Sequence, residues 1–380
     1  MKQKRILLLF LVALLSSLVG LGLVEFGGRK LASNVVGVEE NFYLKYYYSY
    51  HNHWLLNRRK HSDNKNTKRA FPKSDTRLRI YDVSTCRTRA DVAKVLLALD
   101  SLGAKSIALD IFYSDNPDVK DSLNDILVAA IDSIRPKLII PSFNGNYPFF
   151  YDQIDSIKYV SPLRHNYFDD MKTADSLMSV AIAKHFLGKE DLGIKEGMKV
   201  NYLSKQFRIL DNTSDLSRLV KGKIVLVGDL SDSKDFISTP FMIENYNQNF
   251  PGVMNIAYTV NTMLNTGNEH DDDIQKYANY PLQGISNWFT LLLAFILCFI
   301  YALIYDFIST DRKLALVSHG RIVLLLQSSI FLLFEFLVVI VCFLFTRYLN
   351  VIPDVIAFLT SVVCVTFFYG FMSTFKIFRI

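Results

Sequence analysis

The sequence predicts an integral membrane protein in which one α/β domain is carried by four transmembrane helices. Apolar residues gather in one block near the N-terminus and in a longer block after Tyr280. A helix needs about 20 consecutive apolar residues to cross the hydrocarbon core of a bilayer, and both blocks meet that need. The roughly 250 residues between the blocks suffice for one domain with a proper core.

The first predicted span is Ile6–Val24, which follows the basic residues Lys2, Lys4 and Arg5. A cleavable signal peptide is the alternative interpretation. Such a peptide has a shorter apolar region that ends at a small-residue cleavage site. Because the apolar run continues without such a site, an uncleaved anchor is favoured.

The C-terminal block divides into three further spans, at about Ile285–Tyr305, Ile322–Thr346 and Val351–Phe375. The loop between the first two is basic, and so is each chain end. The positive-inside rule therefore places both termini and this loop in the cytoplasm. We expect a multi-pass protein of the cell inner (plasma) membrane with three parts: a cytoplasmic end and anchor (1–29), an extracytoplasmic, periplasmic domain (30–284), and three transmembrane helices (285–380).

This layout restricts function. The expected cytoplasmic segments are too short for a kinase, a cyclase or a DNA-binding domain, and an exported domain is not expected to bind nucleic acid. No zinc-binding spacing, P-loop or G-x-S-x-G motif is present, and only Cys86 lies outside the predicted spans. The sequence therefore predicts no catalytic residue, no metal and no cofactor.

Apolar strand-like segments alternate with amphipathic helical segments between the spans, which favours a mostly parallel sheet covered by helices. Strands are expected at Arg77–Val83, Ser106–Phe112, Lys137–Phe143, Met198–Ser204 and Lys223–Gly228, and helices at Arg89–Leu102, Val119–Ile134, Asp175–Phe186 and Gly252–Leu264. Residues 57–79 are rich in Lys and Arg, which is typical of a solvated loop. A patch for anionic lipid headgroups or an acidic partner is the alternative.

The segment Leu96–Phe112, which ends in Ala-Leu-Asp-Ile-Phe, resembles the front half of a CHASE type-2 domain. Later segments are similar to the same family: Gly222–Gly228 to its late strand, Asp235 with Thr239–Pro240 to its D…TP element, and Phe250–Val253 to the start of its last helix. The resemblance implies an extracytoplasmic sensory domain. Ile256 replaces the family's usual histidine, the D-G…R element is not evident around Phe168–Ala174, and the usual cytoplasmic output domain is missing.

Four carboxylates are the candidate ligand-binding residues: Asp82, Asp110 and Asp229, which lie at or just after the ends of predicted strands, and Asp235, which lies in the next loop. Ligands of open α/β sheets bind beyond the carboxyl ends of the strands. Carboxylates there can hold a cation or accept hydrogen bonds from an amine or from sugar hydroxyls. The alternative is that these residues cap helices and fix loops. Asp110 and Asp235 also match family positions.

Two other groups of side chains could bind a metal ion or make an electrostatic contact. His51 and His53 would need a third ligand such as His61 to bind a metal, and a surface aromatic stretch near the bilayer is favoured instead. The acidic segment from Glu269 to Asp273 is expected to be a solvated linker, with an electrostatic contact to residues 57–79 as the alternative.

Glu335 lies near the middle of the third predicted span, where a charged side chain is costly. Gln327 precedes it by about two turns on the same span. A helix–helix hydrogen bond is the favoured interpretation of these polar side chains. A contact that conveys the state of the protein to a partner, and a proton path, are the alternatives.

These observations predict a membrane-anchored sensor or regulatory module. It would bind an unknown ligand or protein outside the cytoplasm and signal through a separate membrane or cytoplasmic effector, with homodimer formation expected of such a sensor. A structural or assembly component of an envelope complex is the first alternative. An extracytoplasmic enzyme that uses the carboxylate cluster is the second.

Overall fold

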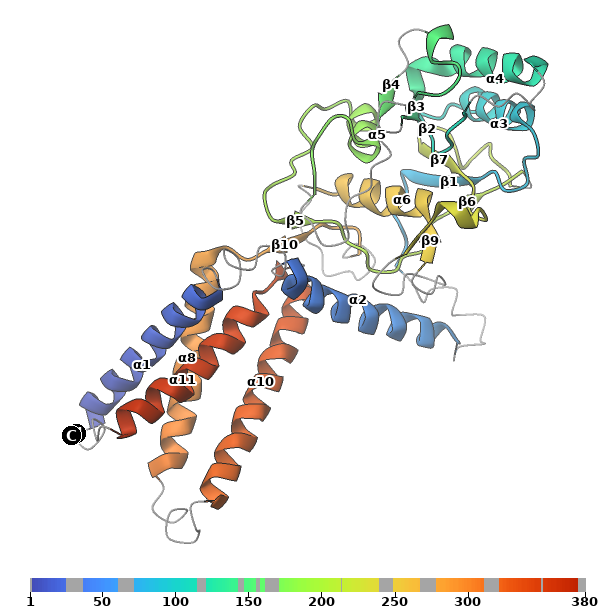
Figure 1. Ribbon diagram of the computed structural model, residues 1–380. Helices are drawn as coiled ribbons and strands as arrows, with labels where there is room; N and C mark the ends of the chain where they lie inside the picture. The colour runs from blue at the N-terminus through green and yellow to red at the C-terminus, as the bar shows by residue number, and fades with distance from the viewer. Residues whose placement is uncertain are drawn as a thin grey trace. The chain divides into compact units, whose positions relative to one another are not determined.

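The computed structural model describes residues 2–24, 37–60, 72–114, 121–142, 147–154, 158–160, 171–212, 214–238, 249–266, 278–310, 321–349 and 351–374. The chain forms two compact units (Figure 1). One comprises Lys45–Leu282, and the other comprises Met1–Leu44 with Gln283–Ile380.

The unit Lys45–Leu282 is built on a six-stranded sheet in which all neighbouring strands are parallel, in the order β4-β3-β2-β7-β1-β6. Its strands are β1 (Leu78–Asp82), β2 (Ser106–Leu109), β3 (Leu138–Pro141), β4 (Lys158–Val160), β6 (Ile209–Leu210) and β7 (Ile224–Gly228). Every residue of β2, β3 and β7 is buried, because the sheet is covered on both faces. The predicted fold class is confirmed.

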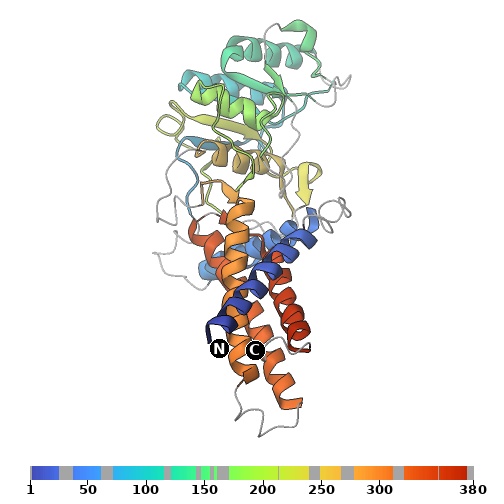
Figure 2. The same cartoon turned by 90° about the vertical axis from the view of Figure 1, so that its left-hand side faces the viewer.

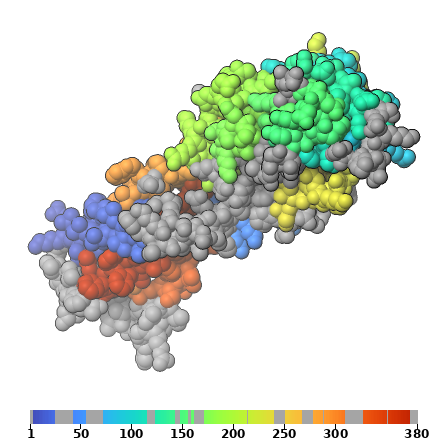
Figure 3. Space-filling model, turned by 45° about the horizontal axis from the view of Figure 1, so that its top comes forward, coloured from blue at the N-terminus to red at the C-terminus, as the bar shows by residue number. Residues whose placement is uncertain are grey.

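Two layers of helices cover the sheet (Figure 1). One layer holds α3 (Arg89–Ser101) and α4 (Asp121–Ile134), which form part of the outer surface in Figure 3. The other holds α5 (Met178–Leu187) and α6 (Gly252–Met263). All twelve residues of α6 are buried, so this helix is part of the core. Apart from Met198–Ser204, the four other predicted strands and all four predicted helices lie within three residues of their expected bounds.

Two predictions for this unit are wrong. Residues 57–60 belong to a long helix, α2 (Gly37–Lys60), and not to a loop, whereas 61–71 lie outside the described residues. The predicted strand Met198–Ser204 is limited to β5 (Met198–Lys199). The reason is that α2 side chains supply the hydrogen bonds that a neighbouring strand would supply. Tyr48 bonds the main chain of Val200 and Tyr202, and Asn52 bonds that of Tyr202 and Ser204.

Short elements complete this unit. The strands β8 (Phe236–Ser238) and β9 (Asn249–Pro251) form an antiparallel pair in which Phe236 lies opposite Pro251. Strand β9 leads directly into α6. The end of β7 packs tightly against the first turn of that helix, since a Cβ atom added at Gly228 would lie 2.9 Å from the Cβ of Val253.

The other unit contains four helices that are long and apolar enough to cross a membrane: α1 (Lys2–Gly22), α8 (Asn287–Thr310), α10 (Arg321–Leu349) and α11 (Val355–Thr374). The predicted spans are confirmed in number and position. The fourth helix begins at Val355, because Val351–Ile352 forms β11, which pairs with β10 (Leu282–Gly284).

Polar and small side chains fix the packing of three of these helices. The carboxylate of Asp306 on α8 accepts hydrogen bonds from Arg5 on α1, at 2.7 Å, and from Tyr369 on α11, also at 2.7 Å. The start of α1 and the end of α11 therefore lie at one end of the bundle (Figure 2). Gly20 permits the close approach of α1 to α11, because an added Cβ would lie 2.7 Å from the Cα of Ser361.

Candidate ligand-binding cleft

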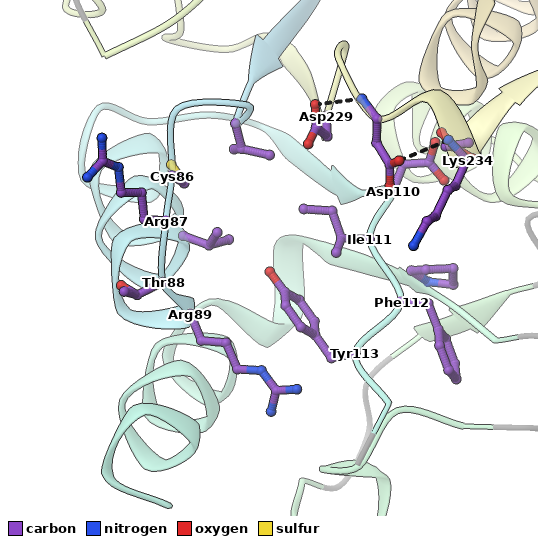
Figure 4. Close-up of a pocket in the computed structure, with 15 residues that line it drawn as sticks. Cys86, Arg87, Thr88, Arg89, Asp110, Ile111, Phe112, Tyr113, Asp229 and Lys234 are labelled. Carbon is purple, nitrogen blue, oxygen red and sulfur yellow. Dashed lines mark hydrogen bonds between the residues drawn. The ribbon is translucent and has the colours of Figure 1, made fainter. Parts of the chain in front are cut away.

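A cleft of about 480 Å³ opens at the carboxyl ends of β1, β2, β3 and β7 (Figure 4). This is the edge at which ligands bind in open α/β sheets. The cleft is lined by Val83, Cys86, Arg87, Thr88, Arg89, Val92, Asp110, Ile111, Phe112, Tyr113, Pro141, Asp229, Asp232, Lys234 and Asp235. Three of the four predicted carboxylates, all except Asp82, therefore come together in one site.

The first wall of the cleft is the start of α3. Thr88 caps this helix: its hydroxyl accepts from the amide of Asp91, and the carboxylate of Asp91 accepts from the amide of Thr88. Such a capping box fixes where a helix begins. It brings the exposed Arg87 and the half-buried Arg89 to the cleft. The guanidinium of Arg89 donates to the carbonyl of Ser114 at 3.0 Å and to Asn124.

Tyr113 lies beneath this wall and is 8% exposed. Its ring is 5.4 Å from the guanidinium carbon of Arg89. Its hydroxyl oxygen is buried and has no hydrogen-bond partner within the described part of the chain. Burial raises the pKa of this hydroxyl, and the nearby positive charge of Arg89 opposes that shift only in part. The hydroxyl therefore stays protonated and can donate a hydrogen bond.

The second wall is the loop that follows β7, which Asp229, Asp232 and Asp235 organise. Asp229 accepts from the amides of Ser231, at 2.7 Å, and Asp232, at 3.2 Å. Asp232 accepts from the amide of Lys234 at 2.9 Å. The side chain of Lys234 points into the cleft (Figure 4). These bonds are typical of aspartates that fix tight turns.

Asp235 also forms a hydrogen bond with the first residue of α6. Its carboxylate accepts from the amide of Gly252, the first residue of that helix, at 3.1 Å. The residue that precedes the helix, Pro251, offers no side-chain cap. Asp235 thus caps α6 from a distant loop, which joins the cleft to the buried helix.

The remaining predicted carboxylates differ in position. Asp110 follows β2 and lines the cleft, and its amide donates to the carbonyl of Val227 at 2.8 Å. Asp82 does not line the cleft. It accepts from the amides of Ser84, at 2.9 Å, and Leu230, at 3.3 Å, and so connects the loops after β1 and β7.

Other features of the cleft limit its chemistry. Burial raises the pKa of the Cys86 thiol, and the carboxylates of Asp91 and Asp82 add to that effect, so the thiol is a weak nucleophile. Among the described residues, no group of three or more His, Cys, Asp or Glu side chains is placed to hold a metal ion.

The structure also locates the other residues considered from the sequence. His51 is 3% exposed and packs against Tyr47 and Trp54, whereas His53 is exposed. The prediction of a surface aromatic stretch is wrong for His51, because alternate residues of a helix point to different faces. His61, Thr239–Pro240 and the segment from Glu269 to Asp273 lie outside the described residues.

The polar residues predicted in the third span lie on α10. Glu335 is half-buried, and its Oε1 atom has no hydrogen-bond partner in the described part of the chain. Gln327 is also half-buried and lies on the same helix. The structure does not pair these two residues with each other.

Sequence reasoning missed Tyr113, Arg87, Arg89 and Lys234. Arg87 and Arg89 flank a recognisable helix-capping residue, which was the available signal. Tyr113 lies in the irregular segment after β2, where neither periodicity nor motif marks it. Its importance follows only from its burial.

A parallel sheet with a polar cleft at its carboxyl edge, joined in one chain to helices that can cross a membrane, defines a membrane-anchored α/β domain. A family model of the CHASE2 domain matches residues 81–302, more than half of the chain, so this chain belongs to the CHASE2 family. CHASE2 domains are extracytoplasmic sensory domains and not catalytic ones. Neither the curated proteins nor the solved structures compared with this chain give a match.

Proposed function

We propose that this chain is a membrane sensor or regulatory module that binds a ligand or protein in the cleft and signals through a separate membrane partner. The observation that carries this proposal is the cleft itself. It lies within the matched sensory domain and combines cationic, anionic and aromatic side chains at a sheet edge suited to ligands.

The connection of the cleft to α6 supports a role in signalling. Asp235 belongs to the cleft and also caps the buried helix α6. A ligand that draws the Asp235 carboxylate toward itself would weaken this cap. The end of α6 would then respond to occupancy of the cleft, although no residue of α6 lines it.

Helix α10 supports the existence of a membrane partner. It exposes Leu332, Leu333, Phe336 and Leu337. Glu335 lies between them in sequence, and its Oε1 atom has no hydrogen-bond partner among the described residues. A carboxyl group inside a bilayer favours a hydrogen-bond partner on a neighbouring helix. We propose that a second membrane protein, or a second copy of this chain, provides that partner, and that Gln327 adds to the same contact.

The proposed location is the inner (plasma) membrane of a bacterium, with both termini in the cytoplasm and the CHASE2 domain in the periplasm. The basic residues near the chain ends and between α8 and α10 support this orientation.

Affinity purification of the full chain in mild detergent, followed by mass spectrometry, tests the function. A stoichiometric signalling protein that is retained with Glu335→Gln and lost with Glu335→Leu would support the proposal, because glutamine keeps the hydrogen-bonding capacity. Recovery inside a large envelope complex, unaffected by either substitution, would favour an assembly role. Recovery of the chain alone would contradict a stable partner.

A further inference from the structure

The two walls of the cleft carry opposite charge. Arg87 and Arg89 come from the start of α3. Asp229, Asp232 and Asp235 come from the loop after β7, where they outnumber the single cation Lys234. Figure 4 shows Arg87 and Arg89 on one side of the cleft and Asp229 and Lys234 on the other. A ligand that enters the cleft therefore meets a cationic and an anionic surface. The hydrogen bonds that each wall already makes distinguish which wall can receive a charged group of the ligand.

The carboxylate wall is already engaged by the protein. Asp229, Asp232 and Asp235 each accept at least one main-chain amide hydrogen. No three acidic or histidine side chains of the described chain form a metal-binding group there. These carboxylates hold the loop and the first turn of α6 in place, and a free cation would have to compete with those bonds.

The wall at α3 offers donors that are not consumed. The amides in the first turn of a helix have no acceptor within the helix. Here the capping box engages the amides of Thr88 and Asp91, and the Asp91 carboxylate also accepts from the amide of Arg87. Within the described part of the chain this leaves the amides of Arg89 and Ala90 without an acceptor. The helix dipole makes this end favourable for negative charge. Arg87 adds an exposed guanidinium, and Arg89 is held in place by Ser114 and by the ring of Phe149 at 4.7 Å.

The buried hydroxyl of Tyr113 is the independent sign of a ligand. In Figure 4 its oxygen points toward the side of the cleft formed by the start of α3, and away from the irregular segment after β2 that carries the residue. A buried hydroxyl without a partner is uncommon, since it loses its hydrogen bonds to water on folding. At this place a bound acceptor group would satisfy the hydroxyl and the first-turn amides together.

We propose that the cleft binds a small organic anion, with a carboxylate or phosphate group received by the first turn of α3 and the Tyr113 hydroxyl, and with the exposed Arg87 adding positive charge at the rim. The rest of the ligand then lies along Ile111, Phe112 and Pro141, and donor groups on it face the carboxylate wall. This assignment rests on the proposed sensory function and names the ligand class for the same cleft.

The test is thermal unfolding and calorimetric titration of the full chain in detergent, at constant ionic strength set with chloride. The probes are succinate, inorganic phosphate, ethanolamine and calcium chloride. Saturable stabilisation by succinate alone assigns a carboxylate, and stabilisation by phosphate alone assigns a phosphate. No response to either oxyanion, or a response only to ethanolamine or calcium, overturns the proposal.

Two tyrosine variants separate binding from folding. Tyr113→Phe removes a hydroxyl that has no hydrogen-bond partner among the described residues. The unliganded midpoint of unfolding is therefore expected to stay the same or rise, while the apparent Kd for the oxyanion rises at least tenfold. Tyr159→Phe is the matched control, because the Tyr159 hydroxyl is also buried and has no hydrogen-bond partner in the described part of the chain, but lies outside the cleft. Its Kd is expected not to change.

Unchanged binding by Tyr113→Phe would overturn the assignment of this hydroxyl. Arg87→Gln should also weaken oxyanion binding. These outcomes are independent of the purification experiment. An anion site without a partner protein would remove the signalling proposal only, and a partner protein without an anion site would remove the ligand class only.

Discussion

Replacement of Asp235 by alanine should destabilise the extracytoplasmic domain by about 1–2 kcal/mol. The carboxylate accepts the amide of Gly252 at 3.1 Å, and loss of such a cap costs about 0.5–2 kcal/mol. The charge also lies at the N-terminus of α6, where the helix dipole favours it, so the expected loss is in the upper part of that range. For a domain of this size the midpoint of thermal unfolding should fall by roughly 2–8 °C.

The assay is thermal unfolding of the full chain, followed by tyrosine and tryptophan fluorescence, with two controls. Asp235→Asn keeps an acceptor and loses the charge, so its midpoint should lie between those of the wild type and the alanine variant. Asp132→Ala removes an exposed carboxylate that pairs with Arg135 on the protein surface, and should have little effect. If Asp235→Ala left the midpoint unchanged but abolished ligand binding, Asp235 would be a ligand contact and not a cap.

Three further substitutions test the packing. Burial acts to raise the pKa of Asp75, but hydrogen bonds from Arg77 lower the pKa overall, so the ionised carboxylate stabilises the fold above its unfolded pKa. In acid titrations, the free energy of unfolding of the wild type should exceed that of Asp75→Asn by a constant amount above about pH 5. This difference should shrink as the pH falls below about 4. Lys205 is 0% exposed and donates to two main-chain carbonyls, so Lys205→Met should cost about 1–3 kcal/mol in chemical denaturation. Gly20→Val should lower the stability of the helical bundle in detergent. Gly22→Val should not, since no described residue lies within 4 Å of a Cβ at Gly22. Equal effects of the two substitutions would contradict the α1–α11 contact.

Much of the fold could be predicted because its elements are governed by local patterns. The buried strands β2, β3 and β7 are short continuous apolar runs, as expected for a parallel sheet covered on both faces. The membrane helices are longer apolar runs, and bilayer thickness sets their length. In both cases hydrophobicity over a short window determines the structure.

Helix α2 could not be predicted in this way. Its aromatic, charged and amide side chains show no apolar periodicity, and one face is buried through polar contacts. Tyr48 and Asn52 hydrogen-bond a segment that lies about 150 residues later in the chain. The same contact explains why the apolar segment Met198–Ser204 is a strand only in its first two residues.

Only part of the candidate site could be predicted from the sequence, for a similar reason. Strand ends identified Asp110 and Asp229, because parallel strands bring their carboxyl ends to one edge. Asp82 obeys the same rule but is turned toward its own loop by Ser84. Tyr113 and Lys234 follow from the course of irregular segments, which no local pattern encodes.

The proposed sensory function requires that the cleft lies outside the cytoplasm and binds a ligand there. Cys86 lines the cleft and is the only cysteine outside the membrane helices, so it reports on both points. A membrane-impermeant maleimide should modify Cys86 in right-side-out membrane vesicles, and a bound organic anion should slow the reaction. The labelling is done at alkaline pH, because the pKa of this thiol is raised and the thiolate is the reactive form. Labelling confined to inside-out vesicles, or a rate that no oxyanion changes, would contradict the account.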